Sequence, residues 1–264
     1  MKNRYYIYLS LLIAIVAVII AKDFIFGKQS PKANAAIEQT EEKNEIVAQE
    51  EVLPEQEYTY LSPYARLSDY DELFREAADS IGYEWTLIAA IAFTESRFDS
   101  TVVSAAGACG VMQMMPSTLR GMKVPESMYK NNRTNVMAAA RLLDSHEKFF
   151  DNIKDRKERL KFVLASYNAG YGHIVDAMNL AEKNGCNKYI WNGCVDSFLV
   201  RKSQPEYYSD PVCRNGEFNN WKQTFAFIRQ VQKHWARFNN TQQAYSDSIN
   251  IVVKNDKTKK IAEK

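Results

Sequence analysis

Glu95 is the residue whose position best suits acid–base chemistry. Leu87, Ile88, Ile91 and Ala92 lie eight, seven, four and three positions before it, so a helix places all five side chains on one face. Burial on an apolar face and the negative end of the helix dipole both disfavour a charged carboxylate, so both raise the pKa of Glu95. Such a carboxyl group can hold a proton near neutral pH and act as a general acid. The same pattern also fits a structural glutamate paired with an arginine.

A glycine-containing segment follows this helix. Gly107 and Gly110 stand three positions apart and lead into Val111, Met112 and Gln113. Glycines let a backbone come close to a bound polymer, and the Gln113 amide is suited to sugar hydroxyl groups. Methionines in such a place more often fill a core. Taken alone, the segment fits either a binding loop or a packed turn.

Three motifs in this order resemble a known family. They are Glu95-Ser96, then Gly107-x-x-Gly110-Val111-Met112-Gln113, and then Tyr167-Asn168-Ala169-Gly170. Their order and spacing resemble the soluble-type lytic transglycosylase domain, which has a goose-lysozyme-like fold, over about residues 66–238. The segment 202–212 resembles the catalytic domain of membrane-bound lytic transglycosylase F more closely.

The resemblance implies a role for each matching residue of the first two motifs. Glu95 would be the sole acid and base of the reaction. Ser96 would help to orient either the substrate or the glutamate. Gly110, Met112 and Gln113 would contribute to substrate binding, with Met112 and Gln113 lining the cleft.

The third motif and the C-terminal part complete the implied site. Tyr167 would point its hydroxyl group toward Glu95, and Asn168 would support that loop. The family has a further tyrosine in its last helix, where this chain has Phe227. Tyr207 or Tyr208 is a candidate to supply the missing hydroxyl group, and we include Tyr207 among the expected substrate-binding residues.

The resemblance also implies a reaction. The expected substrate is the β-1,4 bond between N-acetylmuramic acid and N-acetylglucosamine in peptidoglycan, cleaved without water to leave 1,6-anhydromuramic ends. One alternative is a muramidase of the same fold that uses water, for which Asp99 is the nearest second carboxylate in the sequence. The other alternative is a non-catalytic peptidoglycan-binding or scaffold protein. No cofactor or metal is expected, because the histidines are scattered and the cysteines lack zinc-ligand spacing.

The elements that must position these residues are helices throughout. Apolar periodicity and helix-ending residues predict an all-α fold. The expected helices cover about 70–81, 84–96, 116–121, 134–151, 156–167 and 172–183, with a last one that begins near 221 and ends near 238. Residues 184–220 contain many turn-forming residues and are predicted to form a long loop region. Cys186 and Cys194 bracket a short part of it and are the expected disulfide pair.

The first 57 residues have a different character. Residues 5–21 form an apolar run after Lys2 and Arg4, which we interpret as a membrane anchor with its N-terminus inside rather than a cleaved signal peptide. Residues 38–57 carry eight Glu and one Lys, a composition typical of a solvated linker.

The expected organisation therefore has four parts: an anchor or signal peptide at 1–27, an acidic flexible linker at 28–57, a catalytic domain at 58–238 and a polar tail at 239–264. The catalytic domain is expected outside the cytoplasm, in the cell envelope on the periplasmic side of the inner membrane. The expected partners are peptidoglycan and, through residues 5–21, the membrane. A net charge of +2 does not suggest a nucleic-acid binder.

Overall fold

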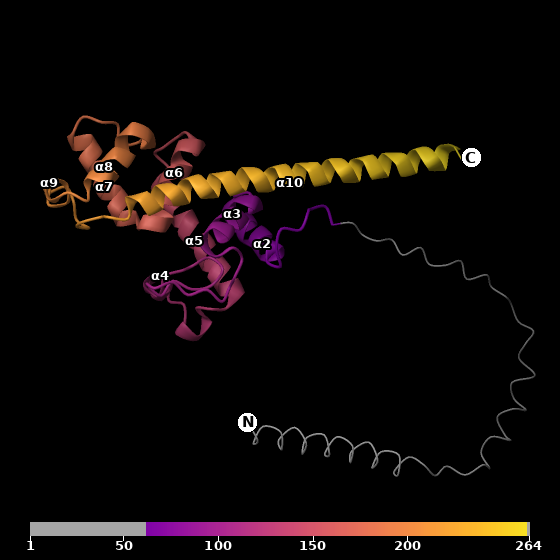
Figure 1. The fold of residues 1–264 in the computed structure, drawn as a ribbon, viewed down its shortest axis with the longest axis horizontal. Helices are drawn as coiled ribbons and strands as arrows, with labels where there is room; N and C mark the ends of the chain where they lie inside the picture. Colours follow the sequence, from indigo (N-terminus) through magenta and orange to yellow (C-terminus); the bar gives the residue numbers. More distant parts are fainter. Residues whose placement is uncertain (1–61, 263–264) are drawn as a thin grey trace, which may run out of the picture. The chain divides into compact units, whose positions relative to one another are not determined.

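The computed structural model describes residues 62–262, with side chains to residue 249. This part is helical, as Figure 1 shows, and contains two isolated β-bridges but no strand. The predicted all-α class is therefore confirmed. The helical elements are α2 (Asp71–Ile81), α3 (Trp85–Ser96), α4 (Pro116–Gly121), η1 (Glu126–Met128), α5 (Asn132–Phe149), α6 (Arg156–Ala169), α7 (Tyr171–Lys183), η2 (Trp191–Val195), α8 (Asp196–Arg201), α9 (Pro205–Tyr208) and α10 (Trp221–Ala262).

Helix α3 lies at the centre of the domain. It packs against α2 and α10, while α6 packs against α5, α7 and α10. Its residues are apolar on nearly every side, as expected of a helix enclosed by others, and Leu87, Ile88 and Ile91 are buried. Full burial of each such side chain contributes about 1.5–3 kcal/mol. The helix that ends at Glu95-Ser96 is therefore a fixed part of the core.

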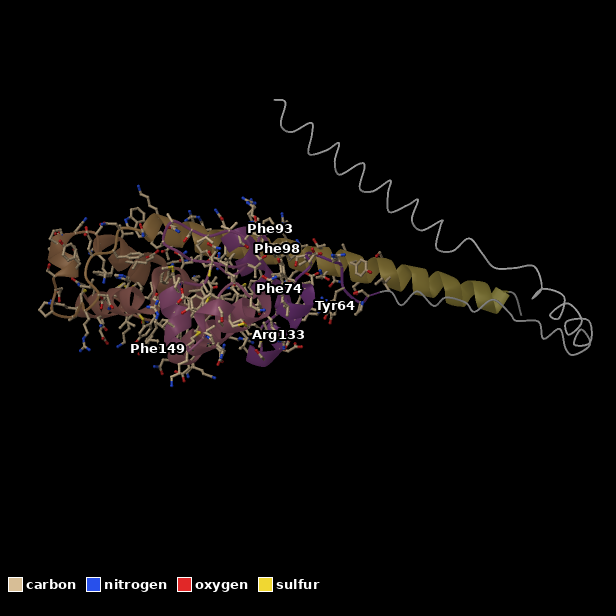
Figure 2. The ribbon with its side chains drawn as sticks, turned by 90° about the horizontal axis from the view of Figure 1, so that it is seen from below. Tyr64, Phe74, Phe93, Phe98, Arg133 and Phe149 are labelled. Atoms are coloured by element: carbon tan, nitrogen blue, oxygen red, sulfur yellow. A yellow bond between two sulfur atoms is a disulfide. The ribbon has the colours of Figure 1, made fainter. Side chains whose placement is uncertain are left out.

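The end of α3 is held by an aromatic cluster. Arg97 and Phe98 both have positive φ, at 55° and 68°, so the chain turns sharply directly after Ser96. The ring of Phe98 packs against Phe93 and Phe74, with ring centroids 5.2 and 5.8 Å apart, as can be followed in Figure 2. This packing stabilises a left-handed turn that residues with a Cβ atom rarely adopt.

Helix α10 differs from the prediction in length. The apolar periodicity ends near residue 238, but the helix continues to Ala262 and includes most of the segment assigned to a polar tail. No glycine or proline occurs between residues 221 and 262 to end it. The added turns also make contacts, because the Gln242 amide forms hydrogen bonds of 2.9 Å with both the N–H and the C=O of Ala65.

The region 184–220 contains more helix than predicted. Its turn-forming residues end short elements rather than excluding them, and η2, α8 and α9 all lie within it. Pro205 begins α9 at a position where the missing N–H of proline costs nothing. The predicted disulfide between Cys186 and Cys194 is confirmed.

A buried ion pair fixes the last part of this region. Lys202 and Asp176 are both almost fully buried and pair with each other. The Asp176 carboxylate also accepts hydrogen bonds from the backbone N–H groups of Arg214 and Asn215, at 3.0 and 2.9 Å. Burial by itself raises the pKa of Asp176, but Lys202 and these N–H groups together hold it below the usual value. The segment that leads into α10 is thereby tied to α7.

Within residues 62–262, no helix combines the length and the apolar character needed to cross a membrane. The predicted anchor at 5–21 and the linker at 28–57 lie outside the described residues, so both stay predictions.

Candidate active site

Glu95 is the carboxyl group at the centre of the candidate site. It lies at the last turn of α3 and lines a cleft of about 320 Å³. Burial raises its pKa to about 8, as the sequence pattern predicts. Among the described residues, its carboxyl group has no hydrogen-bond or ion-pair partner, so the alternative of a glutamate paired with an arginine does not hold there.

The cleft around Glu95 is lined by neutral side chains from several elements. Among the described lining residues, Glu95 is the only one that carries an ionisable carboxyl group. The lining residues are Glu95, Ser104, Ala106, Ala108, Gln113, Met114, Met115, Thr118, Leu142, Tyr167, Asn168, Ala169, Phe218, Asn220, Gln223 and Thr224. Such a lining provides amide and hydroxyl groups for hydrogen bonds to an uncharged polar ligand.

The segment 109–114 is held in place by side chains from three helices. Ser96 of α3 donates a hydrogen bond of 2.8 Å to the Val111 carbonyl oxygen. Asn135 of α5 accepts from the Met112 N–H and donates to the Cys109 carbonyl oxygen, both at 2.9 Å. Because each of these groups is buried, the bonds fix the backbone beside Glu95.

Tyr167 is the third side chain that holds segment 109–114, and we call Ser96, Asn135 and Tyr167 together the clamp. Its hydroxyl group donates a hydrogen bond of 2.8 Å to the Met112 carbonyl oxygen rather than to Glu95. The site still couples the two residues, because burial and then the charge of Glu95 raise the pKa of Tyr167 well above its usual value. Phe227 stacks against the Tyr167 ring at 6.1 Å with an interplanar angle of 5°. Phe227 stands where the resemblance implies a tyrosine, and it supports Tyr167 by packing.

The clamp determines how Gln113 faces the cleft. Gln113 has a φ of 46°, and its amide nitrogen donates to the carbonyl oxygens of Val102 and Gly110 at 2.9 and 3.0 Å. Both N–H groups of this amide are thus occupied, and the side-chain oxygen is left as an acceptor. Gln113 is suited to receive a hydrogen bond from a ligand hydroxyl group.

The start of helix α10 and the residue before it form a wall of the cleft that sequence analysis missed. Asn220 precedes the helix, Gln223 and Thr224 lie in its first turn, and all three line the cleft. The Thr224 hydroxyl group donates a hydrogen bond of 2.9 Å to the Asn168 side-chain oxygen. This bond fixes the orientation of the Asn168 amide. A signal was present, because the polar residues at positions 220, 223 and 224 recur at helical spacing among the aromatic residues Phe218, Trp221 and Phe225.

Several expected binding residues lie elsewhere. Ser96, Gly110 and Met112 are not among the residues that line the cleft; they stand behind it, within or beneath the clamped segment. Tyr207 is also outside the lining: its ring packs near Phe198, with centroids 6.3 Å apart. The structure gives Tyr207 no position from which to replace the hydroxyl group absent at Phe227.

Asp99 is exposed and does not line the cleft. Its carboxylate accepts hydrogen bonds from the Thr101 hydroxyl and N–H groups, at 2.6 and 2.8 Å. These bonds lower the pKa of Asp99. It caps a turn, which is the role that the loop position predicts.

A larger hollow of about 830 Å³ lies at the other end of α3 and α6, beside Trp235. Its carboxylates are already engaged, because Glu84 accepts from the Trp235 indole at 3.0 Å and Glu147 accepts from the Tyr83 hydroxyl at 2.7 Å. The smaller cleft contains the carboxyl group that is free to react, so we place the chemistry there.

Comparison with known proteins agrees with this geometry. Residues 72–190 match the family model described as the transglycosylase SLT domain. Membrane-bound lytic murein transglycosylase F of Desulfosudis oleivorans is 35% identical over 147 residues, covering 56% of this chain and 32% of that protein. The protein of the same name from Maricaulis maris is 38% identical over 144 residues, covering 54% of this chain and 31% of that protein.

Among solved structures, the 70 kDa soluble lytic transglycosylase of Escherichia coli gives a TM-score of 0.42 with 20% identity, covering 65% of this chain and 24% of that one. The part of the chain that contains Glu95 and the clamped segment lies within the residues that match the SLT-type transglycosylase domain model. The curated relatives that it matches are named membrane-bound lytic murein transglycosylase F, and the chain spans about a third of their length.

We predict that Glu95→Gln makes the protein more stable than the wild type at alkaline pH. The pKa of Glu95 is raised in the folded state to about 8, so its contribution to stability is present below about pH 4.5 and is lost as the pH rises through about 8. Glutamine does not titrate. The denaturant midpoint of Glu95→Gln minus that of the wild type should therefore grow as the pH rises from 5 and level off above about pH 8.

Asp99→Asn is the matched control for this experiment. The pKa of Asp99 is lowered, so Asp99 is ionised in both the folded and the unfolded states over that range, and its variant should follow the wild-type pH profile. A constant difference between Glu95→Gln and the wild type would contradict the unpartnered, buried carboxyl group.

We also predict that Gly110→Ala destabilises the domain by about 2–4 kcal/mol, from left-handed backbone strain together with overpacking. Gly110 has a φ of +77°, and a Cβ atom there would lie 2.5 Å from the Asn135 amide. Gly121→Ala is the control, because no atom lies within 4 Å of its Cβ position. Thermal unfolding of both variants measures the difference, and equal stability would argue against the clamp.

Proposed function

We propose that this chain cleaves peptidoglycan glycan strands between N-acetylmuramic acid and N-acetylglucosamine, with Glu95 as acid and then base. The observation that carries the proposal is the unpartnered Glu95 carboxyl group in a neutral cleft, with its pKa raised to about 8 by burial. Such a group is protonated at neutral pH. The SLT-type domain and the names of the matched relatives support the same activity.

In the first step, Glu95 gives its proton to the glycosidic oxygen as the bond from that oxygen to the muramic C1 breaks. Positive charge develops on the muramic ring, and the newly formed carboxylate stabilises it electrostatically. The Gln113 side-chain oxygen, which has no proton to donate, accepts a hydrogen bond from a sugar hydroxyl group and helps to position the ring.

In the second step, the muramic C6 hydroxyl group forms the new bond to C1, and its proton passes to Glu95. The glutamate returns to its starting state, no water is consumed, and the muramic sugar leaves as a 1,6-anhydro ring. An internal nucleophile needs no second carboxylate to activate it, because it is already held close to C1. The family resemblance supports this route, and the cleft is consistent with it.

A water-using hydrolase has less support. An inverting enzyme needs a second carboxylate roughly 6.5–9.5 Å from the acid, and a retaining enzyme needs one at about 5–5.5 Å. Asp99 is engaged with Thr101 and lies outside the cleft. A non-catalytic binder also has less support. A desolvated carboxyl group without a partner reduces stability, and binding alone does not require one.

We predict that digestion of sacculi in heavy-oxygen water yields muramic ends without label, each one water lighter than a reducing end. Glu95→Gln should lose this activity by several orders of magnitude, because the proton donor is absent. Asp99→Asn should retain it. Mass spectrometry of the released muropeptides reads all three results. Labelled reducing ends that disappear in Asp99→Asn would instead identify a hydrolase.

We also propose that the catalytic domain is outside the cytoplasm and attached to the membrane through residues 5–21. The Cys186–Cys194 disulfide favours an oxidising compartment, and the matched relatives are named as membrane-bound.

This proposal predicts two results for protein extracted from the cell envelope. Peptide mapping without reductant should find Cys186 linked to Cys194, and N-terminal sequencing should find the apolar run retained. Free thiols at both positions would contradict export, and a mature N-terminus near Ala36 would contradict anchoring.

A further inference from the structure

A second hollow, of about 610 Å³, lies beside the catalytic cleft. Two chain segments line both sites. Segment 168–172 contributes Asn168 to the cleft and Tyr171 to the hollow, while segment 214–220 contributes Asn220 to the cleft and Arg214 to the hollow. The hollow and the cleft are therefore neighbours along these two segments, although they share no lining residue.

Tyr171 gives the hollow an exposed aromatic ring. It is 43% exposed, and the neighbouring Phe149, which Figure 2 labels, is 46% exposed. The two rings meet edge to face at 4.6 Å, and Tyr171 also stacks against His146 at 6.4 Å. The ring is thus supported by its neighbours while part of it faces solvent. Exposed aromatic rings that have such support commonly mark binding surfaces, and the C–H faces of sugar rings stack on them.

Arg214 gives the hollow its free positive charge. Its guanidinium group is exposed and has no carboxylate partner among the described residues. The other charged groups of the hollow are engaged, because Lys183 pairs with Asp210 and Glu182 pairs with Lys188. Asp176 is buried and bound to Lys202. Since Asp176 also holds the Arg214 N–H at 3.0 Å, the backbone below the free guanidinium group is fixed.

A ligand that suits this hollow has both a sugar face and a carboxylate. In peptidoglycan, muramic sugars carry short peptides with carboxylate groups, so one muramyl-peptide unit offers both features. We propose that the hollow lined by Tyr171 and Arg214 is a second binding subsite for the peptidoglycan strand, where Tyr171 stacks on a sugar and Arg214 pairs with a stem-peptide carboxylate. This inference rests on the proposed function, because it takes the same polymer as the substrate.

The test measures binding, so that it does not depend on turnover. All variants are made in the Glu95→Gln background, and the probes are soluble glycan strands with intact stem peptides and the same strands after an amidase has removed the peptides. We expect Arg214→Gln to weaken binding of the peptide-bearing strands about tenfold and to leave binding of the peptide-free strands unchanged. We expect Tyr171→Ala to weaken binding of both probes, and Tyr171→Phe, which keeps the ring, to retain it.

Two substitutions outside the hollow serve as controls. Tyr189 is 38% exposed and does not line the proposed subsite. Arg156 lines the separate hollow of about 830 Å³ beside Trp235. Tyr189→Ala and Arg156→Gln should both bind like the Glu95→Gln parent. Thermal unfolding of each variant shows that a lost affinity is not a lost fold.

The failure of this inference can be distinguished from the failure of the proposed function. Unchanged binding of both probes by Tyr171→Ala and Arg214→Gln would overturn the subsite, whatever the activity of the wild type. Equal weakening of both probes by Arg214→Gln would overturn the pairing with a stem peptide. Wild-type protein that fails to cleave sacculi would overturn the proposed function, whereas a peptide-dependent effect at Arg214 would still support the subsite.

Discussion

The site depends on one unpartnered carboxyl group that is largely buried at the edge of a cleft. An ionised carboxylate in such a place is costly, so Glu95 keeps its proton, and its pKa is raised by burial to about 8. The domain bears this cost because α3 is enclosed by α2 and α10 along its length. Its buried leucine and isoleucine side chains supply the apolar contacts that hold the glutamate at the end of the helix. Both the position of Glu95 and its raised pKa thus depend on the packing of the core.

The backbone segment beside Glu95 is held by three side chains from different helices. Ser96, Asn135 and Tyr167 come from three helices and all bond to main-chain groups of one segment. Small shifts of these helices would move the segment, so the packing of the bundle and the shape of the cleft cannot vary independently. Phe227 adds to this coupling by stacking on Tyr167, at a position where the resemblance leads us to expect a tyrosine.

Sequence analysis located the acid because Glu95 is a carboxylate at the end of an apolar helix and begins the first motif of the resemblance; since α3 is apolar on nearly every side, periodicity alone does not single out one buried face. It also identified Ser96, Gly110 and Met112 as important, but it assigned Gly110 and Met112 to the substrate, and Ser96 to the substrate or the glutamate, rather than to the backbone. A motif shows that a residue is required without showing which neighbour it contacts. The wall at the start of α10 was missed because Asn220, Gln223 and Thr224 are ordinary polar residues until the fold brings them to the cleft of Glu95. The helix end near 238 was wrong for a similar reason, since burial stops there but helix formation does not.

Helix α10 also acts as a spacer within the domain. Thr224 stands at the cleft, and Gln242 holds Ala65 near the start of the described chain. At about 1.5 Å per residue, the 18 residue steps from Thr224 to Gln242 span about 27 Å. Ala65, near the start of the described chain, is therefore held at a fixed distance from the cleft where a glycan strand would be cut. Under the proposed attachment and activity, this stretch of α10 would separate the cleft from the place where the chain enters the domain.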